Sequence, residues 1–198
     1  MRLVLDWDGT VTERDTLDLV LREFGDPEIY RQVEHELGRA LSLHDVIALE
    51  FETVTAPLPE VEAWLVEHVS VRPGFRELVA RRAPLVVSAG FHELIEPVLA
   101  RESVEVELLA NRVDASPLGW KVLFRDTAPC PVCGEPCKRA ALPAGDPFVY
   151  AGDGYSDRCV ALAAERVFAT GSLAAYLRDR GVQFEPLTDF HELESRLT

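Results

Sequence analysis

Positive charge is scarce in this sequence. The chain has 20 lysine and arginine residues against 34 aspartate and glutamate residues, which gives a formal net charge of −14. Its only lysines are Lys121 and Lys138, so chemistry that needs a lysine has two candidates. A protein of this charge repels polyanions, which argues against nucleic acid and anionic membranes as partners. A small anionic substrate would have to be held by local groups or by a bound cation.

Long apolar runs and a secretory cysteine pattern are also missing. No apolar run reaches the roughly 18–20 residues of a membrane-spanning helix. The first residues lack the charged, apolar and small-residue regions of a signal peptide. Three of the four cysteines are crowded into residues 130–137, unlike the disulfide framework of a secreted domain. We therefore expect a cytoplasmic protein with no membrane partner, and we leave open whether it is a monomer or a homodimer.

The composition is that of a globular protein with one domain and an insertion. Hydrophobic residues make up 47% and charged residues 27% of 198 residues, or about 1.3 domains' worth of chain. Residues 1–13 and 73–198 show alternating strand and helix patterns, which predict an α/β, Rossmann-like core with a parallel sheet. Apolar residues at helical spacing in 14–72 predict a small all-helical cap inserted after the first strand.

Further elements of the core are predicted from local patterns. Strands are expected at residues 3–5, 85–87, 104–109, 148–151 and 167–169. Residues 111–126, with Pro117-Leu118-Gly119 at their centre, predict an antiparallel hairpin or flap. A cysteine loop at 130–137 precedes a short helix that begins near Lys138, and Pro143 is expected to end that helix early.

Polar residues follow three of the predicted strands. Asp6 and Asp8 come after the first strand, Ser88-Ala89-Gly90 after the second, and residues 152–157 after a later one. Ligands of open parallel sheets bind beyond the carboxyl ends of the strands, so these residues are expected to share a site. Each set alone is more typical of a turn or a loop, and only their joint placement favours a site.

The aspartates in these sets predict a metal site. Asp6, Asp8, Asp153 and Asp157 would form a cluster of four carboxylates. So many like charges cannot remain ionised together without a cation, and hard oxygen ligands favour Mg²⁺.

These residues resemble the motifs of one known family. Asp6-Trp7-Asp8-Gly9-Thr10 is similar to the Asp-x-Asp-Gly-Thr motif that follows the first strand of haloacid dehalogenase-like phosphatases. Ser88 matches the second motif of that superfamily, and Gly152-Asp153-x-x-x-Asp157 resembles the fourth. The helical insert at 14–72 matches the superfamily's small helical cap. The resemblance spans nearly the whole chain.

The resemblance implies a Mg²⁺-dependent phosphomonoester hydrolase that acts on a small phosphorylated metabolite. Asp6 would attack phosphorus to form an aspartyl-phosphate, and Asp8 would act as general acid and then general base. Mg²⁺ would be bound by Asp6, Asp153 and the backbone carbonyl of Asp8, with Asp157 supporting the metal shell. The residues implied to bind the phosphoryl group are Gly9, Ser88, Ala89 and Lys138.

The lysine is assigned by its place in the chain. The family's third motif precedes the strand that carries the fourth, and Lys138 stands there, although the interval to Asp153 is short for the family. Lys121 is expected to be a solvated residue of the flap.

Two branches of the family resemble the chain. Phosphoserine phosphatases carry a glutamate nine residues after the nucleophile and an arginine in a later cap helix. Here Asp15 stands at the first position, and residues 45–53 contain no arginine. The methionine-salvage 2-hydroxy-3-keto-5-methylthiopentenyl-1-phosphate phosphatases look closer, with an aspartate at the Asp15 position and a cysteine-rich segment before the lysine. Asp15 is thus interpreted either as a substrate contact or as a helix N-cap.

The cysteines have two interpretations. Cys130, Cys133 and Cys137 contain one half of a zinc-like motif without a clear second half, so a structural Zn²⁺ would need a distant ligand. The other interpretation is free thiols or an adventitious disulfide. Cys159 is expected to be a small buried hydrophobic residue.

Three alternatives to the hydrolase of a methionine-salvage enol phosphate stay open at this point. One is a phosphoserine phosphatase, and another is a phosphotransferase that passes the phosphoryl group to an alcohol. The last is a catalytically inactive binding module on the same fold, although the candidate catalytic residues are all present in the chain.

Overall fold

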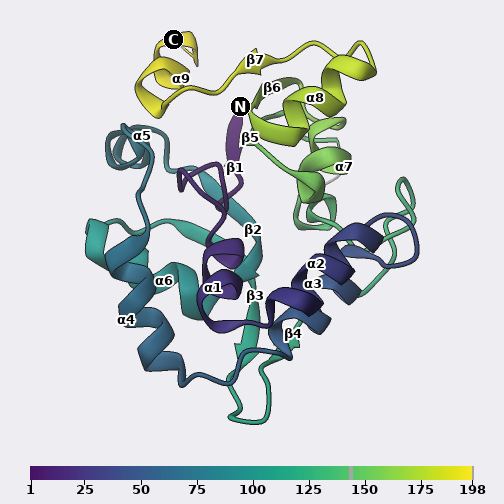
Figure 1. Ribbon diagram of the computed structural model, residues 1–198. Helices are drawn as coiled ribbons and strands as arrows, with labels where there is room; N and C mark the ends of the chain where they lie inside the picture. Colours follow the sequence, from purple (N-terminus) through teal and green to yellow (C-terminus); the bar gives the residue numbers. More distant parts are fainter. Residues whose placement is uncertain (143–144, 198) are drawn as a thin grey trace.

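A mostly parallel β-sheet forms the centre of the molecule (Figure 1). The computed structural model describes residues 1–142 and 145–197. Within these residues one sheet has the strand order β4-β3-β2-β1-β5-β6-β7, and all neighbours pair in parallel except β3 and β4. The strands are β1 (Arg2–Leu5), β2 (Leu85–Phe91), β3 (Glu107–Asp114), β4 (Lys121–Leu123), β5 (Phe148–Gly152), β6 (Arg166–Ala169) and β7 (Glu185–Pro186). The predicted α/β class with a parallel sheet is confirmed.

Helices connect and cover these strands. The α-helices are α1 (Thr16–Phe24), α2 (Pro27–Glu36), α3 (Leu43–Phe51), α4 (Leu58–His68), α5 (Phe75–Arg82), α6 (His92–Glu102), α7 (Arg158–Ala161), α8 (Gly171–Asp179) and α9 (Phe190–Leu197). Two 3-10 helices, η1 (Lys138–Ala141) and η2 (Tyr155–Asp157), precede and follow β5 in the sequence. Pro143, expected to end the first of these, lies outside the described residues. None of the helices in the described part of the chain is long and apolar enough to cross a membrane.

The two faces of the sheet bury separate sets of side chains, because successive residues of a strand point to opposite faces. In β1, Leu3 and Leu5 belong to a core that also includes residues of α5, α6 and α9. Val4 belongs to a second core, which includes residues of α7 and α8. Both faces are therefore covered by helices, as expected of a parallel sheet.

Four helices, α1 to α4, follow β1 and form the predicted all-helical insertion. Asp15, Asp26 and Ser42 each begin a helix by accepting backbone N–H groups with the side chain. The two ends of the insertion meet in an antiparallel bridge between Thr12 and Val71. The insertion packs on the core at two places: α4 lies against α6, and α3 lies beside β4 (Figure 1).

The hairpin predicted at residues 111–126 is present and is fixed to the helical insertion. The end of β3 pairs with β4, and Arg112 lies opposite Leu123. Trp120 is 1% exposed and stacks on Phe51 of α3. Its backbone N–H donates to the carbonyl of Phe51 at 3.1 Å, and its indole N–H donates to the carbonyl of Ala56 at 3.0 Å. The hairpin and the insertion therefore pack as neighbours.

Two strand predictions had wrong ends. Strand β2 runs to Phe91 and not to Val87, because pairing with β3 resumes at Phe91 opposite Asn111 after a register shift. Ser88-Ala89-Gly90 thus lies inside the last part of β2 instead of following it. Strand β3 begins at Glu107 and continues into the first arm of the hairpin, whereas residues 104–109 were expected. The strand β7 was not predicted.

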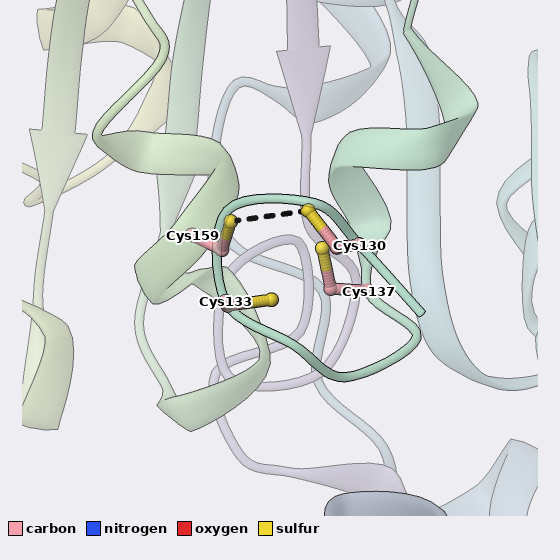
Figure 2. A group of neighbouring side chains, drawn as sticks. All are labelled: Cys130, Cys133, Cys137 and Cys159. Atoms are coloured by element: carbon pink, nitrogen blue, oxygen red, sulfur yellow. Dashed lines mark hydrogen bonds between the residues drawn. The ribbon is translucent and has the colours of Figure 1, made fainter. Parts of the chain in front are cut away.

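The cysteine loop folds against the start of α7 (Figure 2). All four thiols are free. Cys130 and Cys159 are buried, Cys137 is partly buried and Cys133 is exposed. Cys159 is buried as predicted, but its Sγ lies 3.9 Å from that of Cys130, so it also belongs to the cysteine group.

Candidate functional site

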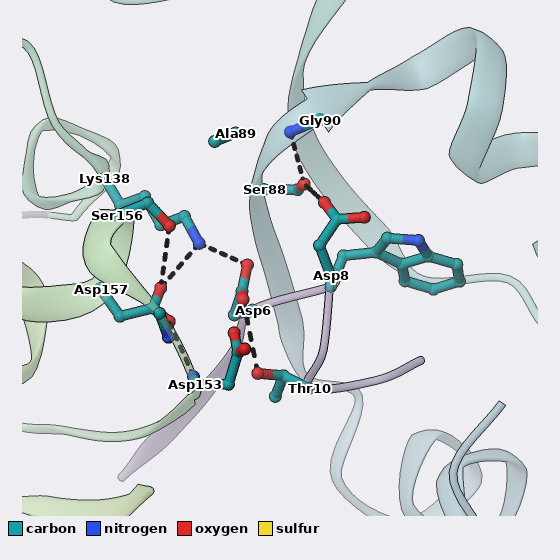
Figure 3. Close-up of polar contacts among 12 residues, drawn as sticks. Asp6, Asp8, Thr10, Ser88, Ala89, Gly90, Lys138, Asp153, Ser156 and Asp157 are labelled. Atoms are coloured by element: carbon teal, nitrogen blue, oxygen red, sulfur yellow. Dashed lines mark hydrogen bonds and ion pairs between the residues drawn. The ribbon is translucent and has the colours of Figure 1, made fainter. Parts of the chain in front are cut away.

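Asp6 lies at the carboxyl end of β1, in the middle of the sheet. Its backbone N–H donates to the carbonyl of Ala151 at 2.9 Å, which continues the pairing of β1 with β5 and fixes the residue at the strand end. The residue is 2% exposed, and one of its side-chain oxygens accepts a hydrogen bond from Lys138 (Figure 3). Burial and then the nearby Asp157 raise the pKa of Asp6 well above its usual range, which Lys138 only partly offsets.

Lys138 joins Asp6 to Asp157. Its side chain is 4% exposed, and its ammonium group donates to both carboxylates, at 2.7 Å in the case of Asp157 Oδ1. Burial alone would lower the pKa of Lys138, but the two carboxylates raise it above its ordinary value, so the lysine remains charged. Lys121, in contrast, lies exposed on β4.

Asp157 accepts hydrogen bonds from several groups besides Lys138. Its Oδ1 also accepts a hydrogen bond from the Tyr150 hydroxyl at 2.6 Å, and its Oδ2 accepts from the backbone N–H groups of Asp153 and Gly154 at 2.8 and 2.9 Å. Although burial alone would raise it, the pKa of Asp157 is below its usual range because Lys138 and these donors favour the carboxylate. Both oxygens are thus engaged, so Asp157 positions Lys138 and the backbone at Asp153.

Three carboxylates converge where a cation could bind. Oxygen atoms of Asp6, Asp153 and Asp157 lie within 4.8 Å of one another. Burial and the charge of Asp157 raise the pKa of Asp153 to about 6. One ammonium group faces these three carboxylates, so negative charge is left over, and hard oxygen donors of this kind suit Mg²⁺. The donor set therefore fits a magnesium ion.

Gly9 allows the loop after β1 to pass close to Asp153. Its φ of +71° lies in the left-handed region, and a Cβ there would stand 2.3 Å from Asp153 Oδ2. The backbone N–H of Gly9 donates to Thr12 Oγ1 at 3.2 Å. In this structure Gly9 allows the loop to contact Asp153, and its backbone N–H is hydrogen-bonded to Thr12 of the same loop.

Asp8 faces away from the other carboxylates. Its Oδ2 accepts a hydrogen bond from Ser88 Oγ at 3.0 Å (Figure 3). Its Oδ1 accepts from the hydroxyl of Thr16 and from the Thr16 backbone N–H, the latter at 3.1 Å. Burial raises the pKa of Asp8, and the hydrogen bonds from Thr16 and Ser88 partly offset this rise. Of the four carboxylates expected to cluster, the structure thus brings three together and turns the fourth toward Ser88.

The end of β2 forms the opposite wall of the site. Ser88 is 4% exposed and accepts a hydrogen bond from the Gly90 backbone N–H at 2.8 Å. A Cβ at Gly90 would lie 2.9 Å from Asp8 Oδ2, so the close approach of Asp8 requires glycine there. The Ala89 carbonyl accepts from the Asn111 side chain at 2.7 Å, which ties this wall to β3.

Two cavities open at this site. The larger, of about 650 Å³, lies between the helical insertion and the carboxylates Asp6, Asp8 and Asp153. The smaller, of about 370 Å³, reaches Ser88 and Lys138 from the side of the cysteine loop. Asp15 lines the larger cavity and is also the N-cap of α1, because its side chain accepts the Asp18 backbone N–H at 3.0 Å. Both interpretations of Asp15 are therefore compatible with its position.

Sequence reasoning missed two buried groups near these carboxylates. Tyr150, in β5, donates to Asp157. The sequence pointed to it only as a tyrosine in a predicted buried strand, where the hydroxyl needs a hydrogen-bond partner.

The second group is Glu50, in α3, which is 4% exposed and lines the larger cavity. No hydrogen-bond donor among the described residues reaches its Oε1. Burial, together with Glu34, Asp15 and Asp18, raises the pKa of Glu50 to about 8. In the sequence, Glu50 could have been noticed as a charged residue between the apolar residues Leu49 and Phe51.

Known proteins are similar to this chain over its full length. A 2-hydroxy-3-keto-5-methylthiopentenyl-1-phosphate phosphatase of Exiguobacterium sibiricum is 24% identical and covers 100% of this chain and 96% of its own. The enzyme of the same name from Brevibacillus brevis is 26% identical and covers 96% of this chain and 92% of its own.

Solved structures and a family model are also similar to this chain. A substrate-bound phosphoserine phosphatase shares 18% identity, with a TM-score of 0.69 and coverage of 98% of this chain and 97% of its own. A phospho-aspartyl intermediate analogue of phosphoserine phosphatase gives a TM-score of 0.65 at 19% identity, with coverage of 98% and 97%. Both share the fold. The family model described as haloacid dehalogenase-like hydrolase matches residues 3–162, which is most of the chain. The chain therefore belongs to the haloacid dehalogenase-like hydrolase family.

Proposed function

We propose that this protein is a Mg²⁺-dependent phosphomonoester hydrolase that forms an aspartyl-phosphate on Asp6 and acts on a small phosphorylated metabolite. The observation that carries the proposal is the arrangement of Asp6. Its carboxylate is buried, is held by Lys138 and stands at the floor of a cavity of about 650 Å³. Asp8, a second buried carboxyl group with a raised pKa, follows two residues later.

In the first half of the reaction, a carboxylate oxygen of Asp6 attacks the phosphorus atom of the substrate. A new oxygen–phosphorus bond forms as the ester bond to the alcohol breaks. Asp8 gives its proton to the departing alcohol oxygen, and its raised pKa suits a general acid. Because Asp8 lies against Ser88 and Thr16 in this structure, its carboxyl group must turn toward the leaving oxygen for this step.

In the second half, water attacks phosphorus and the bond to Asp6 breaks. Asp8, now ionised, takes the proton of the water as general base, and inorganic phosphate leaves. The charged Lys138 stabilises negative charge on the phosphoryl oxygens, and the Ser88 hydroxyl can donate to the same oxygens once Asp8 has turned away. Asp157 keeps Lys138 in place through the 2.7 Å ion pair.

Asp6 and Asp153 are the side chains proposed to hold Mg²⁺, together with the backbone carbonyl of Asp8. When bound, the ion supplies positive charge that offsets the repulsion between the phosphate and the carboxylates. Asp157 is proposed to support this site without direct ligation, because its two oxygens are already engaged.

Residues 14–72 are proposed to act as a cap that covers the site. Helices α1, α2 and α3 contribute walls of the larger cavity, and the two chain connections to the core meet at the Thr12–Val71 bridge. A movement about this point would admit substrate and then limit the access of water. The flap at 111–126 packs on the cap through Trp120 and would move with it.

For the substrate, we favour an enol phosphate of the kind named by the curated relatives over phosphoserine. The cavity wall combines apolar side chains, such as Leu17, Val46 and Ile47, with several carboxyl groups, namely Asp15, Asp18, Glu34 and Glu50. Two arginines also line it: Arg22 is paired with Asp18 at 2.7 Å, and Arg158 lies over the rings of Tyr155 and Tyr176. A substrate carboxylate would meet more acidic than basic side chains here and would add to a crowd of carboxyl groups whose pKa values are already raised, whereas uncharged hydroxyl, keto and methylthio groups would not.

The test is phosphate release from a panel of phosphomonoesters, with Mg²⁺ and with a chelator. The panel contains 2-hydroxy-3-keto-5-methylthiopentenyl-1-phosphate, phosphoserine and a chromogenic aryl phosphate. We expect Mg²⁺-dependent turnover, fastest on the enol phosphate, lost in Asp6→Asn and kept in Asp146→Asn, a control at an exposed aspartate. Faster turnover of phosphoserine would overturn the substrate assignment.

Two further outcomes would overturn the hydrolase itself. Turnover that requires an added alcohol acceptor and yields its phosphate ester would establish a phosphotransferase. Folded protein that binds phosphate esters with Mg²⁺ but turns over none, with or without acceptors, would establish a binding module.

A further inference from the structure

The four cysteines form a ligand set that the proposed reaction does not use. Their sulfur atoms lie within 4.8 Å of one another and face a common centre (Figure 2). Four thiolates at about 2.3 Å from a tetrahedral Zn²⁺ ion lie about 3.8 Å apart, and the Cys130 and Cys159 sulfurs are 3.9 Å apart. A disulfide would require a separation of about 2.05 Å. The spacing is thus that of a metal site rather than of a covalent bridge.

The backbone of the loop is folded around the first of these sulfurs. The N–H of Cys130 donates to the carbonyl of Glu135 at 3.0 Å, and the N–H of Gly134 donates to the carbonyl of Cys130 at 2.9 Å. Gly134 has a φ of +81°, which turns the chain back after Cys133. The backbone N–H of Val132 donates to Cys130 Sγ at 3.5 Å. Amide donors of this kind stabilise a thiolate, which is the form that binds metal.

Burial of apolar side chains does not explain what stabilises the conformation of the cysteine loop. Val132, at its tip, is 60% exposed, and Cys133 is exposed as well. The loop nevertheless brings Cys133 and Cys137 to the buried pair Cys130 and Cys159. A metal ion in the centre would supply the missing stabilisation, as structural zinc does in small loops that lack a core.

We propose that Cys130, Cys133, Cys137 and Cys159 bind a structural Zn²⁺ ion that fastens the cysteine loop to α7. The fourth ligand, which the half-motif lacked, comes from 22 residues beyond Cys137 and is brought in by the packing of α7. With four protein ligands the ion has no open position, which is the form of a structural and not a catalytic zinc site. Soft thiolate ligands select zinc over the Mg²⁺ that suits the carboxylates of the neighbouring site.

The position of this site links it to the proposed reaction. Cys137 immediately precedes Lys138, and Cys159 stands two residues after Asp157. Lys138 and Asp157 form the 2.7 Å ion pair that places the lysine at Asp6. One ion would thus hold together the two segments that carry this pair. This link rests on the proposed function, whereas the metal site itself does not.

The metal site is tested on the full chain, purified without a metal-binding tag and dialysed. Metal analysis should find about one zinc per chain. Replacement by Co²⁺ should give the intense visible bands of a tetrahedral ion and a thiolate-to-cobalt charge-transfer band. Absence of zinc from protein refolded or dialysed with excess Zn²⁺ would overturn the proposal, as would iron in its place or a Cys130–Cys159 disulfide found by mass spectrometry.

Variants at the exposed ligand separate binding from folding. Cys133→Ser removes a ligand without removing a core side chain, so the protein should remain folded by circular dichroism but lose zinc to a competing chelator at least tenfold faster. Cys133→His, which offers a nitrogen ligand, should regain zinc. Val132→Ser, an exposed change in the same loop, should bind zinc as the unchanged protein does. Equal zinc retention in Cys133→Ser and Val132→Ser would contradict the ligand set.

Activity measured on the same samples tests the link to Lys138. Zinc-free protein should hydrolyse phosphate esters at least tenfold more slowly at saturating Mg²⁺ and should recover on addition of zinc. Zinc binding without any hydrolysis would overturn the proposed function and leave the metal site in place. Hydrolysis that is indifferent to bound zinc would overturn the link alone.

Discussion

Thr16, the first residue of α1, donates both its backbone N–H and its hydroxyl to the same oxygen of Asp8. The first helix of the insertion thereby begins on the side chain that we propose as general acid and base. This contact also explains why Asp8 faces away from Asp6 and Asp153, since Ser88 occupies its other oxygen. We therefore expect movement of α1 and rotation of the Asp8 carboxyl group to be coupled.

The first prediction concerns this hydroxyl. In Thr16→Val the hydrogen bond that lowers the pKa of Asp8 is lost, so that pKa rises. The first chemical step needs Asp8 protonated, so the high-pH limb of the kcat/KM profile should move to higher pH. The expected effect is a shift of this limb and not a loss of kcat at its plateau, because Asp8 leaves Thr16 in order to reach the leaving oxygen. Thr16→Ser keeps the hydroxyl and should behave normally. If the high-pH limb of the kcat/KM profile does not move in Thr16→Val, the Thr16 hydroxyl does not set the pKa of Asp8.

The second prediction concerns the buried lysine. Lys138→Met leaves Asp6 and Asp157 buried without their cation, so the free energy of unfolding should fall by about 3–5 kcal/mol. Urea unfolding at neutral pH measures this change. Asp157 has a pKa below its usual range in the folded protein, so its contribution to stability is present at neutral pH and is lost on acidification. This loss should be smaller in Lys138→Met.

The other lysine of the chain supplies the control. Lys121 is exposed on β4, so Lys121→Met should leave both stability and activity within error of the unchanged protein. Comparable losses in the two variants would show that burial between the carboxylates is not what makes Lys138 important.

The fold could be predicted from the sequence where the pattern of apolar residues is local. The parallel sheet, the helical insertion after β1 and the hairpin follow from alternation, spacing and turn residues. The ends of β2 and β3 could not be predicted in this way, because pairing of Phe91 with Asn111 depends on which strands become neighbours. The two-residue strand β7 has too little sequence to carry a pattern.

The candidate site shows the same division. Asp6, Asp153 and Asp157 could be placed together because each follows a strand that ends at one edge of the sheet. The direction of the Asp8 side chain could not, because it depends on where α1 begins. Cys159 looked like an ordinary buried residue, and only the packing of α7 against the loop brings its sulfur to Cys130.

The third prediction concerns the buried carboxyl group in the insertion. The pKa of Glu50 is about 8 in the folded protein against an ordinary value of 4.5, because it is buried near Glu34 and Asp15. Between these pH values the unfolded chain has released the proton that the folded protein still holds, so stability falls as pH rises. Glu50→Gln removes this dependence and should be more stable than the unchanged protein at pH 8, by about 2 kcal/mol at 1.4 kcal/mol per pKa unit with allowance for partial relaxation. Chemical denaturation at several pH values from 5 to 8 measures the difference.

Glu52→Gln, at an exposed position just beyond the same helix, is the matched control and should show no such gain. A difference between Glu50→Gln and the unchanged protein that does not grow with pH would mean that Glu50 is already ionised in the folded protein.

The last prediction concerns the carboxylate group as a Mg²⁺ site. An ion that binds only the folded protein stabilises it, by about 2.7 kcal/mol when its concentration is 100 times Kd. Thermal unfolding should therefore shift to higher temperature as Mg²⁺ is added and return with a chelator. Asp153→Asn removes a proposed ligand and should abolish this shift, while Asp146→Asn, at an exposed position, should preserve it. Without the ion, Asp153→Asn should be no less stable than the unchanged protein, because it removes one of three neighbouring negative charges. A Mg²⁺ shift that survives in Asp153→Asn would place the ion elsewhere. Thermal scans of both variants with and without Mg²⁺ thus separate repulsion among the carboxylates from ligation of the metal.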